Sequence, residues 1–412
     1  MLSWKSFKDI LKGKKILIGV TGGIAIYKSL GLVSSLVKEK ADLKIIMTPD
    51  SQKFVSKITF ASVGNCEVFT DPFDFKIEIP HTTLSRWADI IVIAPATANT
   101  MAKIANGFAD NLLTMTTLAF NKWKILVPTM NVRMYENPIT LENIQKLKKL
   151  GWLIVEPEVG RLACGDIGKG RYPENEKIIE TIKDSFIGRK KIEGLSALVT
   201  AGPTVEWIDP VRYISNPSSG KMGYAIAKEL IKRGFKVTLI SGPTHLLPPE
   251  QLQEFVPVES AQQMYEETLK RFRKTNLLVM TAAVADFRPK GRKKQKIKKE
   301  SLEGLNIELV RNPDILKEVS KFKENQIIVG FAAESEELLK NAKRKLSEKK
   351  LDLIVANDIS RKGIGFSSDY NEVKLIHPDG KVEEIERSSK EYIAYVICDK
   401  LIDVFNAKKQ LT

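Results

Sequence analysis

The chain has 412 residues, enough for two or three domains that each bury their own hydrophobic core. No apolar run approaches the roughly 20 residues of a membrane span, and the first residues lack the apolar stretch of a signal peptide. The net charge of +15 fits nucleic acid or phosphate-bearing small molecules, and the spread of the lysines along the chain favours the latter. Cys66, Cys164 and Cys398 are too widely spaced for a disulfide framework. We therefore expect a cytoplasmic protein that binds neither nucleic acid nor membranes.

The first half of the chain alternates short apolar runs with amphipathic stretches, which predicts a doubly wound α/β sheet. The predicted strands cover residues 14–20, 43–47, 89–94, 123–127 and 152–155. Each ends in small or polar residues, where open α/β sheets bind ligands. The first strand ends at Thr21-Gly22-Gly23, which lacks the G-x-G-x-x-G pattern of dinucleotide binding. This turn either offers its backbone N–H groups to a phosphate or is a tight turn without a ligand.

A glycine-rich segment around Cys164 lies near the end of this half. Residues 161–171 contain one cysteine, three glycines and basic residues at both ends, without an apolar period. We expect a mobile loop rather than a core helix or strand. It is either a lid that brings a thiol over a bound ligand or a surface loop with an incidental cysteine.

The α/β pattern restarts after a charged break at residues 185–194. Strands are predicted at 195–200, 235–240, 277–282, 327–331 and 353–356, followed by a hairpin whose turn is His377-Pro378-Asp379-Gly380. We therefore predict two domains, residues 1–188 and 189–412, both with Rossmann-like doubly wound sheets.

Two basic segments of the second half have more than one interpretation. Gly220-Lys221 is not a P-loop, because Met222 replaces the Ser or Thr that would hold magnesium. We interpret it as a helix start where an anion could dock. The run from Arg288 to Lys299 is either a solvated face or a flexible clamp on a triphosphate.

Short motifs follow one another along nearly the whole chain. In the first half they are Gly22–Lys28, Ile79–His81, Pro95–Thr100, Pro128–Tyr135 and the Cys164 segment. In the second half they are residues 201–206, 208–212, 215–223, 282–287, 296–299 and 312–314. In this order they resemble the bifunctional coenzyme A biosynthesis family, which joins a phosphopantothenoylcysteine decarboxylase to a phosphopantothenate–cysteine ligase. Thr129 stands where relatives usually carry alanine.

The resemblance implies that the first domain is a flavodoxin-like FMN protein. FMN would oxidise the substrate thiol to a thioaldehyde, which accepts the electrons released with carbon dioxide; the resulting enethiolate is then reduced and protonated. Cys164 would donate that proton, Asn131 would bind the substrate carboxylate with Met134 close by, and His81 would be a base or positioning group. An isolated histidine is more often part of the core, so the motif order alone supports His81. The residues expected to contact FMN are Gly22, Gly23, Ile24, Thr48, Ala98, Asn99, Thr100 and Thr129.

The resemblance also implies a CTP-dependent second domain. Phosphopantothenate would attack the α-phosphate of CTP, and the amine of cysteine would displace CMP from the acyl-cytidylate. Lys296 would neutralise the triphosphate, Asn216 would hold the acyl-cytidylate or cysteine, and Arg212 would bind substrate. Asp286 and phosphate oxygens would hold Mg²⁺. The further residues expected to contact CTP are Met280, Thr281, Ala282, Asp286, Asn312, Pro313, Asp314, Ile315, Phe331, Lys345 and Lys349.

The family further implies a homo-oligomer with trimeric decarboxylase units and dimeric ligase units. Three other interpretations stay open. Flavin prenyltransferases share the fold of the first half but lack the Cys164 lid and the ligase half. The phosphatase-regulatory relatives share that fold too, but would not need Lys296 or the residues assigned to CTP. A nucleic-acid binder is supported by the net charge alone.

Overall fold

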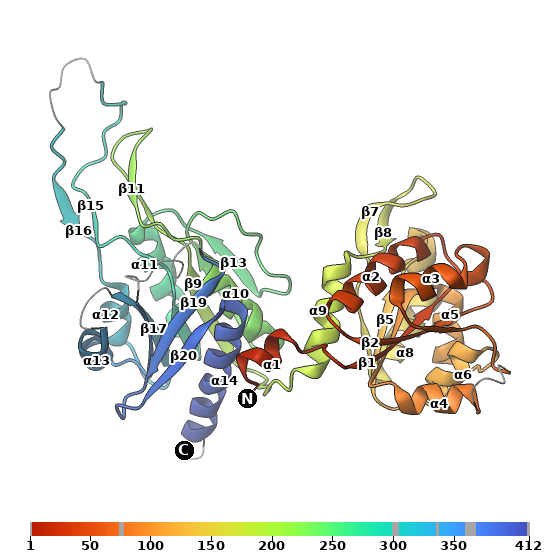
Figure 1. The fold of residues 1–412 in the computed structure, drawn as a ribbon. Coiled ribbons are helices and arrows are strands. Elements are labelled where there is room, and N and C mark those ends of the chain that lie inside the picture. Colours follow the sequence, from red (N-terminus) through yellow and green to blue (C-terminus); the bar gives the residue numbers. More distant parts are fainter. Residues whose placement is uncertain (1, 74–77, 299–304, 335–337, 359–367, 410–412) are drawn as a thin grey trace. The chain divides into compact units, whose positions relative to one another are not determined.

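The computed structural model describes residues 2–73, 78–298, 305–334, 338–358 and 368–409. The chain forms two compact units, Leu2–Gly188 and Arg189–Thr412, each built around its own sheet (Figure 1). Lys299, which belongs to one of the motifs above, lies outside the described residues.

The first unit contains a parallel six-stranded sheet in the order β3-β2-β1-β4-β5-β6. Its central strand β4 is buried along its whole length, as expected for a parallel strand covered on both faces. The strands are β1 (Lys15–Val20), β2 (Asp42–Met47), β3 (Glu67–Phe69), β4 (Ile90–Ala96), β5 (Trp123–Pro128) and β6 (Trp152–Ile154).

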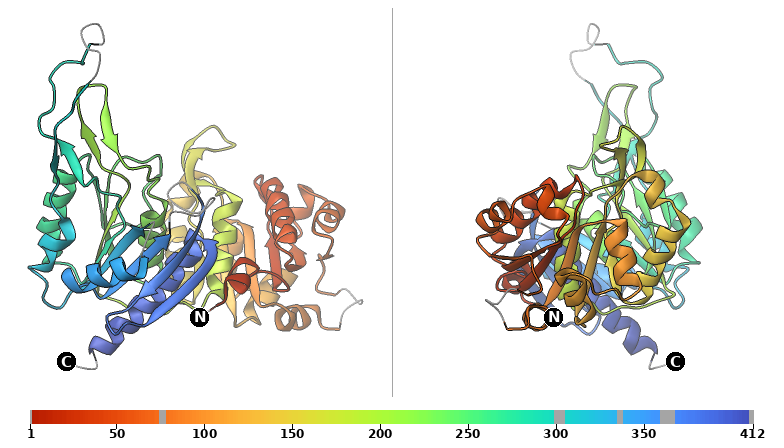
Figure 2. Two further views of the ribbon diagram at one scale, coloured as in Figure 1. Left: turned by 60° about the vertical axis from the view of Figure 1, so that its left-hand side comes forward. Right: turned by 90° about the vertical axis from the view of Figure 1, so that its right-hand side faces the viewer.

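Helices cover both faces of this sheet (Figure 2). One core layer packs Leu84, Met101, Leu113 and Leu147 of four helices against Ile93 and its neighbours in the sheet. The helices are α1 (Trp4–Lys8), α2 (Ile26–Lys38), η1 (Ser51–Lys53), α3 (Lys57–Gly64), α4 (Pro80–Trp87), α5 (Ala98–Ala105), α6 (Leu112–Leu118), α7 (Val132–Tyr135), α8 (Pro138–Lys149) and α9 (Asn175–Phe186). On the longer helices, such as α2, α5, α8 and α9, the apolar residues recur at helical spacing, so one stripe of each is buried.

The second unit contains an eight-stranded sheet in the order β13-β12-β9-β14-β17-β18-β19-β20. The pairs from β13 to β18 are parallel, and β19 and β20 add an antiparallel edge. The strands are β9 (Ser196–Ala201), β12 (Lys236–Ser241), β13 (Glu254–Pro257), β14 (Leu277–Met280), β17 (Ile327–Glu334), β18 (Leu353–Asp358), β19 (Tyr370–Ile376) and β20 (Val382–Ser389). The helices are α10 (Lys221–Lys232), α11 (Ala261–Phe272), α12 (Ile315–Ser320), α13 (Leu338–Glu348) and α14 (Lys390–Lys409).

Three antiparallel strand pairs lie outside the two sheets. They are β7 (Glu158–Arg161) with β8 (Ile167–Arg171), β10 (Val205–Trp207) with β11 (Tyr213–Ser215), and β15 (Phe287–Pro289) with β16 (Leu309–Arg311). The expectation of a loop at residues 161–171 was therefore wrong for β8. Its backbone pairs with β7 although its side chains follow no apolar period, because a two-stranded ribbon outside the core needs none.

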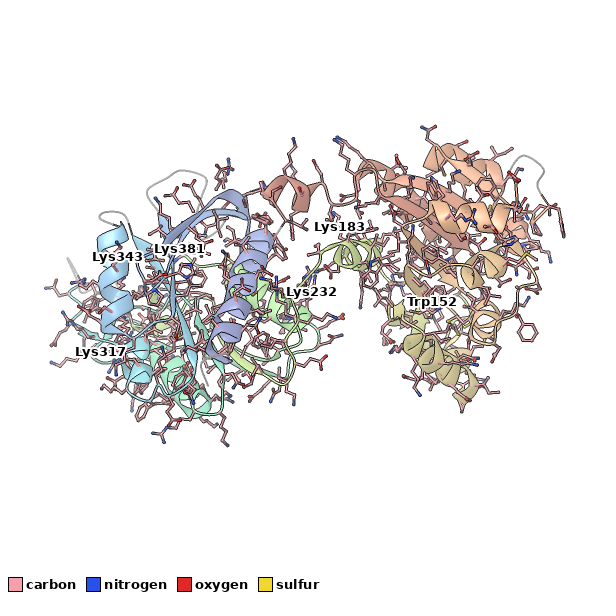
Figure 3. The ribbon with its side chains drawn as sticks, turned by 90° about the horizontal axis from the view of Figure 1, so that it is seen from below. Trp152, Lys183, Lys232, Lys317, Lys343 and Lys381 are labelled. Atoms are coloured by element: carbon pink, nitrogen blue, oxygen red, sulfur yellow. The ribbon has the colours of Figure 1, made fainter. Side chains whose placement is uncertain are left out.

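Most strands lie where the apolar runs predict them, and the hairpin at His377–Gly380 is confirmed by the backbone hydrogen bond from Gly380 to His377. The short edge strands β3 and β13 were not predicted. Both are only partly buried, so their sequences lack the apolar run that marked the central strands. Five lysines labelled in Figure 3 come from separate parts of both units, which agrees with a positive charge spread along the chain.

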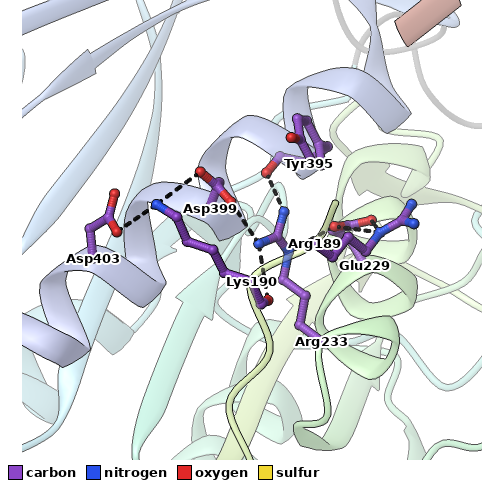
Figure 4. A network of polar contacts seen from close by, with 7 residues as sticks. All are labelled: Arg189, Lys190, Glu229, Arg233, Tyr395, Asp399 and Asp403. Atoms are coloured by element: carbon purple, nitrogen blue, oxygen red, sulfur yellow. Dashed lines mark hydrogen bonds and ion pairs between the residues drawn. The ribbon is translucent and has the colours of Figure 1, made fainter. Parts of the chain in front are cut away.

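Among the described residues, Arg233 is the largest fully buried side chain, and it joins three parts of the second unit (Figure 4). Its guanidinium contacts Glu229 at 2.7 Å, Asp399 at 2.9 Å and the backbone oxygen of Tyr395 at 3.0 Å. Arg189 also contacts Glu229, at 3.1 Å. The network therefore ties the first residues of the unit to α10 and α14.

Replacing Arg233 with methionine should strongly destabilise the second unit. Methionine fills a similar space but leaves the buried carboxylates of Glu229 and Asp399 without their shared cation, at a cost of about 3–5 kcal/mol. Amide hydrogen exchange of β9 and β14 measures the opening of this unit by itself. The control is Lys290→Met, which removes a well-exposed ion pair with Glu308 and should cost less than about 1 kcal/mol. Equal small losses in both variants would show that the network contributes little.

Candidate active sites

The first unit contains a cavity of about 850 Å³, within the usual range for small-molecule sites of about 300–1,000 Å³. It lies at the carboxyl ends of β1, β2, β4 and β5, where the turns after the parallel strands meet. All residues predicted to contact the flavin line this cavity: Gly22, Gly23, Ile24, Thr48, Ala98, Asn99, Thr100 and Thr129. Asn131, Met134 and Cys164 line it as well. Residues distant in sequence thus converge at one edge of the sheet.

The turn after β1 lies close to another backbone segment. A Cβ atom on Gly22 would lie 2.6 Å from the Cβ atom and 2.9 Å from the backbone carbon of Asp50, so the turn has no room for a side chain. The following helix α2 has no side-chain cap, which leaves N–H groups of its first turn without a side-chain acceptor. Lys28, in that first turn, also lines the cavity. An uncapped helix start with a nearby ammonium group fits the phosphate of a mononucleotide.

The hairpin β7–β8 carries Cys164 at its tip. Gly165 adopts a φ of +93° in the tip, and the backbone N–H of Leu162 donates to the backbone oxygen of Asp166 at 2.8 Å. At the base, a Cβ atom on Gly170 would lie 2.2 Å from the backbone oxygen of Met130. Only glycine therefore lets β8 lie directly against the segment that holds Asn131.

Asn131 connects the tip of this hairpin to α7. Its Oδ1 atom accepts the N–H of Arg133 at 2.8 Å as the cap of α7, which fixes the orientation of the amide. Its Nδ2 atom then lies 3.0 Å from Cys164 Sγ and 3.0 Å from Asp166 Oδ2. Cys164 Sγ is itself 3.6 Å from Asp166 Oδ2. The hydrogen bonds from Asn131 and Cys164, together with the nearby Arg133, lower the pKa of the Asp166 carboxyl.

His81 does not line the cavity within the described chain. It is the second residue of α4 and is half-buried. Asp166 was not predicted as a site residue. Its proximity to Cys164 in sequence was a possible signal, but its contact with Asn131 depends on how the hairpin folds back.

The second unit contains a cavity of about 780 Å³. Most residues predicted to contact CTP or the acyl-cytidylate line it: Asn216, Met280, Thr281, Ala282, Asp286, Asn312, Pro313, Asp314, Ile315, Phe331 and Lys349. Gly220 and Lys221 line it too, at the start of α10, which has no side-chain cap. Here again a helix start without a capping side chain lies at the edge of a parallel sheet.

Hydrogen bonds hold two asparagines in this cavity. Asn216 Nδ2 donates to the backbone oxygens of Ala283 and Val284 at 3.2 and 3.1 Å. Asn312 Nδ2 donates to the backbone oxygen of Ala285 at 2.8 Å. Both side chains thus fix the segment that follows β14.

Lys349 is paired with Asp314 across the same cavity, at 2.8 Å. Burial alone would raise the pKa of the Asp314 carboxyl, but Lys349 and the backbone N–H of Lys317 outweigh it and lower that pKa. Lys345 does not line the cavity, although it lies four residues before Lys349. The helix α13 ends at Glu348, so Lys349 lies just beyond it.

Arg212 and Lys296 also lie away from the cavity lining, and Asp209 links their segments. Arg212 Nη1 contacts Asp209 Oδ2 at 2.6 Å and the backbone oxygen of Ile297 at 3.2 Å. The N–H of Ile297 donates to Asp209 Oδ2 at 3.2 Å. Burial would raise the pKa of the Asp209 carboxyl, but hydrogen bonds from the backbone N–H groups of Val211, Ile297 and Arg212, and from the Arg212 guanidinium, lower it to about 2. The exposed Lys296 is therefore next to Ile297, whose backbone is held by Asp209 and Arg212. This part of the basic segment has a defined position.

Sequence reasoning missed Lys390, which lines the second cavity at the first position of α14. Only 4% of it is exposed. Burial, followed by the charge of Lys221, lowers the pKa of Lys390 to about 8, against the opposing effects of Asp369 and Glu391. A lysine near a chain end gives no sequence signal for such burial.

Within the described residues, no group of three or more His, Cys, Asp or Glu side chains could hold a metal ion. None of the helices in the described parts is long and apolar enough to cross a membrane.

Two family descriptions match the two units of the chain. The family described as "Flavoprotein" matches residues 5–187, and "DNA/pantothenate metabolism flavoprotein C-terminal domain" matches residues 192–405. The coenzyme A biosynthesis bifunctional protein CoaBC of Bacillus subtilis is 43% identical over 396 residues, covering 95% of this chain and 97% of the relative. The protein of the same name from Escherichia coli is 39% identical, covering 97% and 99%.

The chain belongs to the family of coenzyme A biosynthesis bifunctional proteins. It is therefore a bifunctional enzyme with a flavoprotein unit, as the order of its motifs predicted. Among solved structures, a C-terminal domain of a CoaBC protein is 39% identical and covers 52% of this chain and 98% of its own, with a TM-score of 0.45.

Replacing Gly22 with alanine should remove the flavin from the first unit. The new Cβ atom would push the turn after β1 away from Asp50 and displace the start of α2. We expect purified Gly22→Ala to lack the visible absorbance of bound flavin. The control is Gly188→Ala, where a Cβ atom meets nothing within 4 Å. Full flavin content in Gly22→Ala would contradict a role of this turn in binding.

Proposed function

We propose that the enzyme makes 4′-phosphopantetheine from 4′-phosphopantothenate and cysteine in two reactions. The second unit ligates the two substrates at the expense of CTP, and the first unit decarboxylates the 4′-phosphopantothenoylcysteine that results. The observation that carries the proposal is the convergence of Asn131 and Cys164 on the cavity lined by every predicted flavin contact.

The cofactor of the first unit is FMN. Bound FMN supplies the two-electron redox chemistry that turns the substrate thiol into an electron sink for the departing carboxylate. The uncapped start of α2 and Lys28 would hold its phosphate, and the residues after β4 and β5 would contact its ring.

The side chains of the first unit then bind and protonate the substrate. Asn131 donates an N–H to the substrate carboxylate, and Met134 packs beside it. Cys164 donates a proton to carbon once carbon dioxide has left; its exposed position on a hairpin tip suits a group that must approach the ligand. His81 acts as a base or positioning group from a neighbouring copy of the chain, since it is not part of the cavity lining of its own chain.

The second unit activates the carboxylate of phosphopantothenate as an acyl-cytidylate. The first residues of α10 and the segment after β14 bind the nucleotide. Phosphate oxygens and Asp286 hold Mg²⁺. Lys349 leaves its ion pair with Asp314 and pairs with a phosphate group of the nucleotide instead. Asn216 orients the acyl group. Lys296 contacts the triphosphate and Arg212 contacts the substrate. The cavity that they serve belongs to the same chain or to a neighbouring copy of it. The assembly is a homo-oligomer of decarboxylase trimers and ligase dimers.

Replacing Cys164 with serine should trap the enethiol product. Serine keeps the size of the side chain, but its hydroxyl is a far weaker acid than a thiol and transfers a proton poorly. We expect carbon dioxide release within tenfold of the wild-type rate, with enethiol as the main product by mass spectrometry. Normal pantetheine output would refute the role of Cys164 as proton donor.

Replacing Lys296 with glutamine should abolish ligation and spare decarboxylation. The substitution removes a charge that would stabilise the triphosphate while the carboxylate of phosphopantothenate attacks its α-phosphate, which we expect to slow the reaction by about 100-fold or more. CTP-dependent pyrophosphate release measures ligation, and carbon dioxide release from 4′-phosphopantothenoylcysteine measures decarboxylation. Lys290→Met, a nearby exposed lysine, is the matched control. Loss of both activities would indicate a folding defect instead.

A further inference from the structure

The amide of Asn131 has two N–H bonds, and both have acceptors in the structure. Because Oδ1 caps α7 through Arg133, Nδ2 must face the hairpin tip. One N–H reaches Cys164 Sγ and the other reaches Asp166 Oδ2, each at 3.0 Å. Asn131 can therefore take a new acceptor only by giving one of these up.

The proposed function, on which this inference rests, requires such an exchange. Asn131 is to bind the carboxylate of the substrate, and Asp166 already presents a carboxylate to the same amide. Two carboxylates cannot share one N–H, and their like charges repel at this distance. The neutral sulfur of Cys164 does not repel an incoming carboxylate, whereas the charged Asp166 does, so Asp166 is the relevant competitor.

We infer that Asp166 is a positioning residue that holds Asn131 in place of the substrate carboxylate and returns to it when that carboxylate has left. Substrate binding displaces Asp166 from Asn131, and with it the hairpin tip that carries Cys164. Loss of carbon dioxide removes the competing acceptor. Asp166 then re-forms its hydrogen bond to Asn131. Cys164 Sγ lies 3.6 Å from Asp166 Oδ2 when that bond is made, so the thiol returns to the ligand together with Asp166.

This arrangement delivers the proton donor only after decarboxylation. In the proton transfer the S–H bond of Cys164 breaks and a C–H bond forms on the enethiolate. The bonding pair of the S–H bond stays on sulfur as a thiolate, and water later returns a proton to it.

The test compares two ligands that differ only in the carboxylate. 4′-Phosphopantothenoyl-alanine keeps the carboxylate, and N-ethyl-4′-phosphopantothenamide lacks it. Neither has a thiol, so bound flavin cannot oxidise them. Their dissociation constants are measured with flavin-loaded full-length enzyme, whose flavin spectrum also reports that each variant is folded.

Removing the competitor should tighten binding of the carboxylate ligand alone. For Asp166→Ala we expect the dissociation constant of the carboxylate ligand to fall on the order of tenfold, because the Asn131 amide is then free to bind the ligand without first losing Asp166. Asp166→Asn should give a smaller gain, because its amide oxygen still accepts but carries no charge. The N-ethyl ligand should bind equally to all forms. The control is Asp42→Asn, which removes the same charge from the exposed start of β2, at the opposite end of the strand from the cavity.

The result that overturns the inference is an unchanged or weaker affinity of Asp166→Ala for the carboxylate ligand, or an equal change for both ligands. Asn131→Ala, measured in parallel, tests the proposed function separately. If this variant binds the carboxylate ligand as well as the wild type does, the role of Asn131 fails. If it loses that ligand while the Asp166 variants show no gain, only the role of Asp166 fails. With the thiol substrate, the Asp166 variants should also release a larger fraction of enethiol.

Discussion

Parallel strands bring their carboxyl ends to one edge of a sheet, and both cavities depend on this constraint. In the first unit, the turns after β1, β2, β4 and β5 form the cavity wall. In the second unit, the segment after β14 meets the uncapped start of α10. Each sheet is stabilised by helices on both faces, so the polar groups of the site can stay at the edge without cost to the core. The same construction therefore forms the flavoprotein cavity of one unit and the cavity proposed for a nucleotide in the other.

Within the first cavity, the proposed chemistry depends on the placement of the Asn131 amide. Asn131 caps α7 through its Oδ1 atom, and both N–H bonds of its amide donate to residues of the hairpin tip. The hairpin can approach so closely because Gly170 has no side chain against Met130. A carboxylate, a thiol and an amide thus form a compact group whose contacts can be exchanged for those of a carboxylate ligand. The hairpin tip has a defined position, because Cys164 and Asp166 both accept hydrogen bonds from Asn131.

The sequence was sufficient for the central strands and for most residues around both cavities. Runs such as residues 89–94 are apolar because β4 is buried on both faces, and the positions after such strands lie at the ligand edge. It was insufficient where tertiary contacts decide. β8 pairs without an apolar period, Asp166 reaches Asn131 only after the hairpin folds back, and Lys390 is buried by packing at the start of α14. His81 and Lys296 matched the family motifs, yet neither belongs to the lining of these two cavities.

The most direct test of this account is a crystal structure of the flavin-loaded enzyme with a bound ligand that carries the substrate carboxylate. The account predicts that Asn131 Nδ2 donates to the ligand carboxylate, that Asp166 has left the amide, and that the tip with Cys164 has moved with it. A ligand carboxylate bound elsewhere in the cavity, with the bond between Asn131 and Asp166 intact, would contradict it.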